Sequence, residues 1–294
     1  MTAVRIAGAP ISWGVCEVPG WGHQMGPDRV LDEMVALGIS ATEFGPVGFL
    51  PEDPEGRRQV LEAKQMTAVG GFLPVVLHDP QHDPMPEVLR ELEAFVAAGA
   101  EVMVLAAATG VEGYDQPRPT MTDAHWATMA NNLRHIEKVA GEQGVLAVIH
   151  PHAGTMVETS DDVAKVLEMT QTLFCMDTGH MFLGGVDPVT FVREHGNRVG
   201  HVHFKDIRLD IARRVQAGEL TYYEAVVAGV YTPLGQGDVD VRAIIDALTD
   251  HGYTGWYVLE QDLVVTSEPG AGDGPVADAK ASVEFLRAAV EGRV

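Results

Sequence analysis

Four side chains of the types that bind divalent metals stand at the ends of short apolar segments in the second half of the chain. They are His150, Asp177, His203 and Glu260. Two imidazoles and two carboxylates form a mixed nitrogen and oxygen set, which suits Mn²⁺, Fe²⁺, Co²⁺ or Zn²⁺. Mn²⁺ is favoured where carboxylates and water complete the coordination shell. We therefore predict a divalent metal site with these four ligands and with Mn²⁺ as the first choice of ion.

Two of these ligands have a second histidine on the same face of their segment. Side chains alternate across a strand, so His150 shares a face with His152, and His203 shares a face with His201. The periodicity alone therefore does not decide which histidine of either pair binds the metal.

The elements that must position these residues can be read from the alternation of short apolar runs with amphipathic stretches of helical period. This pattern is typical of β-α units around a parallel sheet. Eight strands are expected, at 5–11, 41–45, 68–77, 101–107, 145–151, 174–179, 199–206 and 255–262. Helices are expected at 28–37, 55–66, 85–98, 122–142, 160–169, 188–196, 241–251 and 276–290. Residues Thr122, Ser160 and Asp187 are of the type that caps helix N-termini, and Pro188 suits a first helical position.

Eight evenly spaced units predict an α/β fold with a single (β/α)8 TIM barrel over residues 1–294. A doubly wound open sheet is the rival, but no Gly-x-Gly-x-x-Gly turn follows the first strand. Active sites of such barrels lie at the C-terminal ends of the strands, so the four metal ligands should meet in one mouth. The segment 208–237 is too long for an ordinary connection after the seventh strand and contains a helix-like part at 219–227. An insertion of this kind commonly forms a lid or an oligomer contact, so a homo-oligomer is possible.

Composition argues against several classes of partner. The chain has 20 basic and 42 acidic residues and a formal net charge of -22, which would repel nucleic acid and an anionic membrane surface. Its two cysteines, Cys16 and Cys175, form no Cys-x-x-Cys motif, so neither a disulfide framework nor a thiolate zinc site is indicated. The N-terminus shows no signal-peptide pattern, and no long apolar run occurs, so we expect a cytoplasmic protein.

The motifs at the strand ends resemble those of the xylose-isomerase-like sugar isomerase/epimerase superfamily. Within it the chain is most similar to the inosose dehydratases of inositol catabolism, and the resemblance runs over nearly the whole chain. The motifs that carry it are Gly8-Ala9-Pro10-Ile11-Ser12-Trp13, Thr42-Glu43, His150-x-His152-x-Gly154-Thr155, Asp177-Thr178-Gly179-His180, His203-x-Lys205-Asp206, Glu260 and the insertion segment Leu220 to Val226 followed by Pro233-x-Gly235-x-Gly237.

This resemblance implies a ligand set. In the superfamily the metal is usually held by Glu, Asp, His and Glu from strands five to eight, and this chain matches the last three at Asp177, His203 and Glu260. His150 stands where the first Glu is expected, which favours the dehydratases over the typical epimerases. Pro151 differs from the histidine often found there in the dehydratases.

The resemblance also implies a reaction. We expect a metal-dependent hydro-lyase that dehydrates a cyclic polyol ketone of the 2-keto-myo-inositol type through an enediolate, which a Lewis-acidic metal can stabilise. The alternatives are an isomerase or epimerase of a free ketose, a related lyase that cleaves C-glycosides, and a sugar-binding protein with a degenerate site.

The acid and base of such a reaction stay open in the sequence. Lys205, Glu43 and His152 are the candidates for proton transfer. Lys205 could instead form an ion pair with Asp206 or Glu43.

Further polar or aromatic residues at the strand ends are candidates for binding the polyol substrate. They are Trp13, His78, His180 and Arg208. Of these, Trp13 could pack its indole on the apolar face of a sugar ring, and His180 could bind a substrate hydroxyl or orient a metal ligand.

Overall fold

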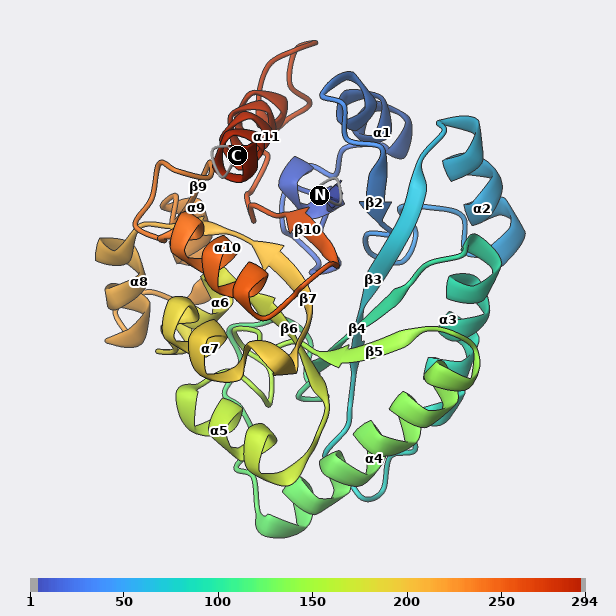
Figure 1. The fold of residues 1–294 in the computed structure, drawn as a ribbon, viewed down its shortest axis with the longest axis vertical. Helices are drawn as coiled ribbons and strands as arrows, with labels where there is room; N and C mark the ends of the chain where they lie inside the picture. Colours follow the sequence, from blue (N-terminus) through green and yellow to red (C-terminus); the bar gives the residue numbers. More distant parts are fainter. Residues whose placement is uncertain (1–4, 292–294) are drawn as a thin grey trace.

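Eight parallel strands close into a barrel in a computed structural model that describes residues 5–291 (Figure 1). Their order around the barrel is β1-β10-β7-β6-β5-β4-β3-β2. The strands are β1 (Arg5–Gly8), β2 (Ala41–Glu43), β3 (Thr67–Val75), β4 (Val102–Ala107), β5 (Leu146–Ile149), β6 (Leu173–Asp177), β7 (Val199–Phe204) and β10 (Trp256–Leu259). The prediction of a (β/α)8 barrel is confirmed, and each predicted strand overlaps one of these.

The helices surround the barrel, as Figure 1 shows. Eight of them match predictions: α1 (Pro27–Ala36), α2 (Pro54–Ala63), α3 (Met85–Ala98), α4 (Asp123–Glu142), α5 (Ser160–Met169), α7 (Pro188–His195), α10 (Val241–Asp250) and α11 (Pro275–Glu291). Thr122 and Asp187 cap α4 and α7 as expected. The cap of α5 is Thr159, not Ser160, which is the first residue of the helix.

Two predicted strands end earlier because a short helix begins at their end. After β1, residues Pro10–Trp13 form the 3-10 helix η1, where the fixed φ of Pro10 suits a first helical position. After β6, residues Thr178–Leu183 form α6, which Asp177 caps. A second 3-10 turn, η2 (Gly196–Arg198), leads into β7.

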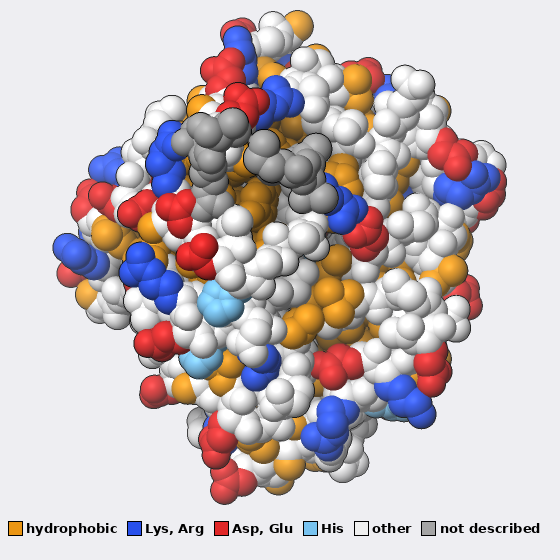
Figure 2. Space-filling view, in the orientation of Figure 1, with side chains coloured by type: hydrophobic (Ala, Val, Ile, Leu, Met, Phe, Trp, Pro, Cys, Tyr) orange, Lys and Arg blue, Asp and Glu red, His pale blue; other side chains and the backbone are white. Residues whose placement is uncertain are grey.

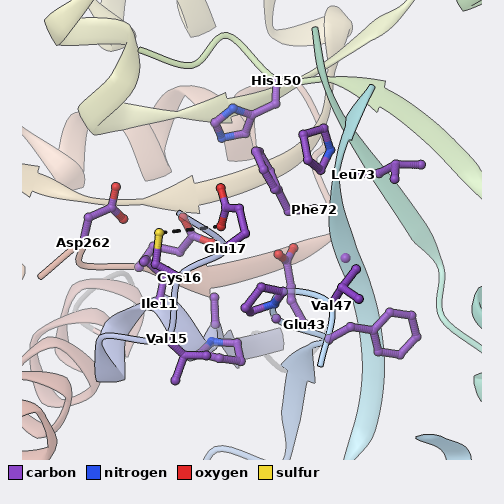
Figure 3. A pocket seen from close by; sticks show the side chains of 18 of the residues that line it. Ile11, Val15, Cys16, Glu17, Glu43, Val47, Phe72, Leu73, His150 and Asp262 are labelled. Atoms are coloured by element: carbon purple, nitrogen blue, oxygen red, sulfur yellow. Dashed lines mark hydrogen bonds between the residues drawn. The ribbon is translucent and has the colours of Figure 1, made fainter. Parts of the chain in front are cut away.

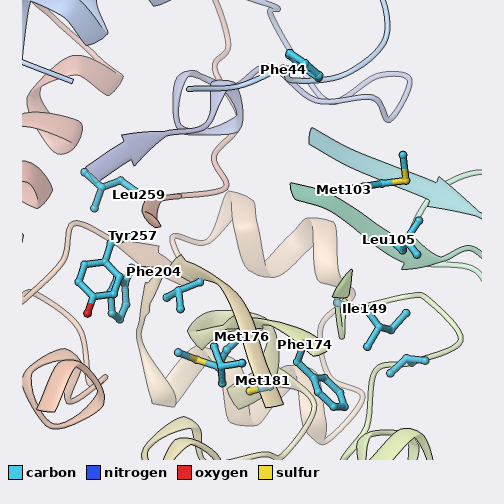
Figure 4. Close-up of a cluster of buried hydrophobic side chains, with 14 of the residues drawn as sticks. Phe44, Met103, Leu105, Ile149, Phe174, Met176, Met181, Phe204, Tyr257 and Leu259 are labelled. Atoms are coloured by element: carbon cyan, nitrogen blue, oxygen red, sulfur yellow. The ribbon is translucent and has the colours of Figure 1, made fainter. Parts of the chain in front are cut away.

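Small and large side chains divide between the two faces of the barrel wall. The side chains that point inward near the N-terminal ends of the strands are mostly small. They belong to Ala7, Ala41, Val69, Val102, Val104, Val148, Cys175 and Val258. Large apolar side chains point outward and pack under the helices, and examples in Figure 4 are Met103, Leu105, Ile149, Phe174, Phe204 and Leu259. Each such side chain contributes roughly 1.5–3 kcal/mol through burial. Packing outside the barrel therefore holds the wall in shape and leaves its C-terminal mouth for polar groups.

The segment after β7 adds a small layer beside the barrel mouth. Strands β8 (Asp206–Ile207) and β9 (Tyr231–Thr232) pair antiparallel, with α8 (Leu209–Gln216) and α9 (Tyr222–Val227) between them. The predicted helix at 219–227 corresponds to α9, whereas α8 was not predicted.

Asp206 anchors the end of this segment. Its carboxylate accepts hydrogen bonds from the backbone N–H groups of Gly235 at 2.8 Å, Gly237 at 3.0 Å and Val239 at 2.9 Å. Burial raises the pKa of Asp206, although these hydrogen bonds oppose the rise. At Gly237 a side chain is excluded, because a Cβ atom would lie 2.3 Å from Asp206 Oδ1.

The surface carries both signs of charge. On the face drawn in Figure 2, acidic and basic side chains are interspersed. Among residues 5–291, no helix has the length and apolar character needed to cross a membrane.

Replacing Asp206 with Asn should destabilise the fold, because an amide presents a donor to some of the N–H groups that the carboxylate now accepts. We expect a loss of about 2–4 kcal/mol in the free energy of unfolding, measured by urea denaturation. Asp240→Asn is the matched control, since Asp240 caps α10 from the surface and Asn caps helices about as well as Asp. Equal stability of the two variants would contradict this role of Asp206.

Candidate active site

Strand register brings three of the four predicted metal ligands together at the barrel mouth. Asp177 at the end of β6 is the direct partner of His203 on β7, and β10 pairs with β7 on its other side. Glu260 directly follows β10, and its N–H donates to the Phe204 carbonyl at 3.1 Å. His203 Nδ1 consequently lies 3.6 Å from Asp177 Oδ2 and 3.3 Å from Glu260 Oε2.

Within the described part of the chain, two of the facing atoms are buried and make no hydrogen bond. Asp177 Oδ1 accepts from the His180 N–H at 2.9 Å, which caps α6, while Asp177 Oδ2 makes no hydrogen bond and is contacted by the Lys205 ammonium, whose Nζ lies 3.0 Å away. His203 Nδ1 likewise makes no hydrogen bond. Buried polar atoms are almost always satisfied. A carboxylate oxygen and an imidazole nitrogen left facing each other, with a second carboxylate beside them, fit a bound divalent cation.

His150 is better placed than His152 to join these ligands. His150 Nε2 lies 3.5 Å from Asp177 Oδ2, and its ring centre is 5.1 Å from that of His203. Its side chain is buried and its Nδ1 makes no hydrogen bond to any of residues 5–291. His152 instead uses its Nδ1 in a 2.7 Å hydrogen bond to the Ala153 carbonyl. The geometry therefore favours His150 as the fourth ligand.

Lys205 lies among three carboxylates. Its Nζ is 3.0 Å from Asp177 Oδ2, 2.8 Å from Glu260 Oε2 and 3.1 Å from Asp262 Oδ1. Burial disfavours the ammonium form, but the three carboxylates outweigh it and raise the pKa of Lys205 well above its usual value. Neither partner expected from the sequence, Asp206 or Glu43, contributes to these ion pairs. Lys205 is thus protonated and held in position at the barrel mouth.

Three residues that sequence analysis did not select complete the surroundings of Lys205. Asp262 accepts a short hydrogen bond from the Tyr222 hydroxyl of α9, which also lies 3.3 Å from the Tyr231 hydroxyl of β9. Lys205 Nζ lies 5.6 Å from the centre of the Tyr231 ring. Asp262 follows Glu260 by two residues, so strand alternation could have indicated it. Tyr222 lies in the insertion segment that carries the family resemblance, whereas no sequence signal pointed to Tyr231.

A stack of two histidines forms another wall of the site. The rings of His152 and His180 lie 3.8 Å apart, and the Ala153 N–H donates to His180 Nδ1 at 3.3 Å. Because a carbonyl only accepts, the bond to the Ala153 carbonyl identifies His152 Nδ1 as the protonated nitrogen. Burial, followed by the neighbouring His180, lowers the pKa of His152 well below its usual value. His152 is therefore neutral, with the lone pair on Nε2.

Glu43 crosses the barrel interior from β2 and meets two histidines of β7. Its Oε1 lies 2.9 Å from His201 Nε2 and 3.0 Å from His203 Nε2. Burial opposes its ionisation, but the charge of His203 and these two hydrogen bonds lower the pKa of Glu43 below its usual value.

A cavity of about 250 Å³ opens beside these groups. Figure 3 shows His150 and Glu43 reaching it from β5 and β2, with Phe72 between them. Its polar lining includes Glu17, Glu43, His150, His152, His203, Lys205, Tyr222, Glu260 and Asp262, and its apolar lining includes Ile11, Val15, Trp21, Val47, Leu50 and Phe72. A small molecule with both hydroxyl groups and an apolar ring face suits such a cavity.

Four residues predicted to bind substrate lie outside the lining of this cavity. Trp13 is 1% exposed, and its indole N–H donates to Glu33 on α1 at 2.8 Å. His78 packs edge-on against His125 of α4. The Arg208 side chain is exposed at the surface and pairs with Asp210. His180 lies behind His152, with its Nε2 3.6 Å from Asp262 Oδ2.

Removal of the Lys205 charge should destabilise the metal-free protein, because three buried carboxylates would lose their shared cation. For Lys205→Met after chelator treatment we expect a loss of about 3–5 kcal/mol in the free energy of unfolding at pH 7. Added Mn²⁺ should restore more stability to this variant than to the unaltered protein. Lys165→Met, which removes a surface pair with Glu168, is the control and should cost less than about 1 kcal/mol. A small loss in both variants would contradict the ion-pair account.

Comparison with known proteins places the chain among barrels of one type. A family model described as xylose isomerase-like TIM barrel matches residues 31–289. An inosose dehydratase of Halalkalibacterium halodurans is 31% identical over 266 residues, which cover 86% of this chain and 86% of that protein. An inosose dehydratase of Geobacillus kaustophilus is 30% identical over 272 residues, which cover 88% of this chain and 87% of that protein.

Solved structures share the fold at low sequence identity. The IOLI protein, whose structure contains a zinc atom, superposes with a TM-score of 0.72 at 11% identity, covering 98% of this chain and 99% of that chain. An L-ribulose 3-epimerase gives a TM-score of 0.69 at 16% identity, covering 98% of this chain and 95% of that chain. At such identities the likeness concerns the fold.

Proposed function

Because this chain belongs to the xylose isomerase-like TIM barrel family, we propose that it is a metal-dependent hydro-lyase that dehydrates a cyclic polyol ketone of the 2-keto-myo-inositol type. The observation that carries the proposal is the group of Asp177, His203 and Glu260, whose ligand atoms lie within 4.8 Å of one another beside a cavity. The relatives named inosose dehydratase, which match most of the chain, support the choice of reaction.

His150, Asp177, His203 and Glu260 would hold the metal. A bound divalent cation would supply a Lewis acid for the ketone oxygen of the substrate. The mixed imidazole and carboxylate set accepts Mn²⁺, Co²⁺, Fe²⁺ or Zn²⁺. Because the structure of the IOLI protein contains a zinc atom, Zn²⁺ should be tested beside Mn²⁺.

His152 is the proposed base. Its Nδ1–H is held by the Ala153 carbonyl and its ring is packed between His180 and Tyr114, with ring centres at 3.8 and 4.4 Å. This arrangement leaves the Nε2 lone pair as the acceptor for a proton from the carbon next to the ketone. A positioned base of this kind contributes about 10²–10⁴-fold to the rate.

Lys205 is the proposed acid. Its ammonium group lies in the cavity lining next to Glu260 and Asp262, so it can donate a proton to the departing hydroxyl. The C–H bond next to the ketone breaks toward His152, the C–O bond at the following carbon breaks, and the hydroxyl leaves as water. Return of one proton from His152 to Lys205 by way of solvent restores both groups.

An isomerase or epimerase of a free ketose would use the same first step without losing water. The same base could remove and return a proton next to the ketone. Whether a hydroxyl leaves therefore has to be measured, because proton removal alone does not separate the two reactions.

The test follows the reaction of 2-keto-myo-inositol by ultraviolet absorbance of the dione product. Chelator-treated protein should be inactive, and Mn²⁺, Co²⁺ or Zn²⁺ should restore activity. His152→Phe, which keeps a ring in the stack, should lower kcat by about 10²–10⁴-fold while leaving metal affinity unchanged. His135→Phe on the exposed side of α4 is the control and should keep wild-type activity.

Other results would change the assignment. Exchange of the proton next to the ketone with deuterated water, without absorbance growth, would replace the dehydratase with an isomerase or epimerase. Full activity of His152→Phe would remove His152 as the base. Full activity after complete metal removal would refute the metal-dependent reaction.

A further inference from the structure

Below the proposed metal site, a chain of three buried side chains runs from the barrel mouth toward its N-terminal end. His203 Nε2 lies 3.0 Å from Glu43 Oε1, and the same oxygen lies 2.9 Å from His201 Nε2. The three side chains are at most 3% exposed. His201 also lines a cavity of about 420 Å³ at the N-terminal end of the barrel, so it marks the lower end of this chain.

The hydrogen bonds identify Nε2 as a protonated nitrogen of both imidazoles. An ionised carboxylate only accepts, so both Nε2 atoms must be the donors. A neutral ring that donates through Nε2 carries its lone pair on Nδ1. His203 Nδ1 is the atom that faces Asp177 Oδ2 at 3.6 Å and Glu260 Oε2 at 3.3 Å. Glu43 therefore acts on the nitrogen of His203 that points away from the ligand cluster.

His201 holds Glu43 from the other side. Its bond to Glu43 Oε1 is 2.9 Å long, against 3.0 Å for that of His203, and it comes from the same strand two residues earlier. Without this donor, the Glu43 carboxylate could rotate away from His203. A donor that restrains the carboxylate thus restrains the ring of His203 as well.

We propose that Glu43 and His201 are positioning residues that hold His203 in the Nε2–H tautomer and present its Nδ1 lone pair to the metal. The proposal rests on the proposed metal site and gives Glu43 a role other than proton transfer with the substrate. Partners of this kind typically change metal affinity by 10- to 100-fold when they are removed.

The test compares Glu43→Leu, which removes the acceptor, with Glu43→Gln, which keeps an acceptor oxygen. Chelator-treated proteins are titrated with Co²⁺ and followed by its visible absorption, and turnover is measured at saturating metal. We expect about 10- to 100-fold weaker Co²⁺ binding for Glu43→Leu, with intermediate affinity for Glu43→Gln. Saturating metal should restore most of the turnover to Glu43→Gln.

The control is Glu33→Leu, since Glu33 also accepts from two donors, Trp13 Nε1 at 2.8 Å and Arg29 Nε at 2.9 Å. This variant should change stability without changing Co²⁺ affinity. A second pair, His201→Phe and His201→Gln, tests the lower end of the chain. We expect about tenfold weaker binding for His201→Phe and recovery in His201→Gln, whose amide N–H replaces the imidazole donor.

If Glu43→Leu does not fold, imidazole ¹⁵N shifts of the unaltered zinc-loaded protein report the His203 tautomer directly. A metal-bound Nδ1 with a protonated Nε2 supports the proposal, and the opposite tautomer overturns it. Wild-type Co²⁺ affinity in both Glu43 variants, with turnover lost at saturating metal, would overturn it in favour of proton transfer. Failure of the unaltered protein to bind Co²⁺ would instead refute the metal site itself.

Discussion

The compensation of buried negative charge is the constraint on which the barrel mouth depends. Asp177, Glu260 and Asp262 are at most 8% exposed at their side chains, and burial of an uncompensated carboxylate costs several kcal/mol. Lys205, which directly follows β7, compensates all three. Two neighbouring helices contribute to this arrangement. One oxygen of Asp177 caps α6, which leaves the other oxygen facing Lys205. Helix α9 supplies Tyr222, whose hydroxyl donates to Asp262. At Gly179 a Cβ atom would lie 2.8 Å from Lys205 Cβ, so the close approach of α6 requires glycine.

The barrel, and the meeting of Asp177, His203 and Glu260 at its mouth, could be predicted from sequence because both follow from strand periodicity. Alternation along the strand at 199–204 placed His201 and His203 on one face but could not rank them. The ranking comes from Asp177 and Glu260, which face His203 Nδ1 at 3.6 and 3.3 Å. Glu43 contacts both rings, and it reaches them across the barrel from 158 and 160 residues away. Such a contact depends on closure of the sheet, and no local pattern reveals it. For the same reason the sequence offered Asp206 or Glu43 as ion-pair partners of Lys205, whereas Asp206 accepts from backbone N–H groups and Lys205 pairs with Asp177, Glu260 and Asp262.

The sequence analysis missed the elements and contacts that show no strand or helix periodicity in the residues themselves. Helix α6 starts directly at the end of β6, so its residues were read as part of the strand end. Tyr222 and Tyr231 belong to an insertion whose position over the mouth is set by contacts to Asp262 and Asp206, not by its own pattern. Trp13 follows a strand end, but the turn of η1 directs its indole to Glu33 and away from the cavity. A residue's place at a strand end therefore does not by itself put it in the site.

The central claim is that a divalent metal binds between His150, Asp177, His203 and Glu260. The most direct measurement is a crystal structure of the protein soaked in Mn²⁺, with anomalous scattering recorded to locate the ion. The account predicts one strong anomalous peak within coordination distance of His203 Nδ1, Asp177 Oδ2 and Glu260. No peak there, or a peak bounded by His152, His180 and Asp262, would contradict it.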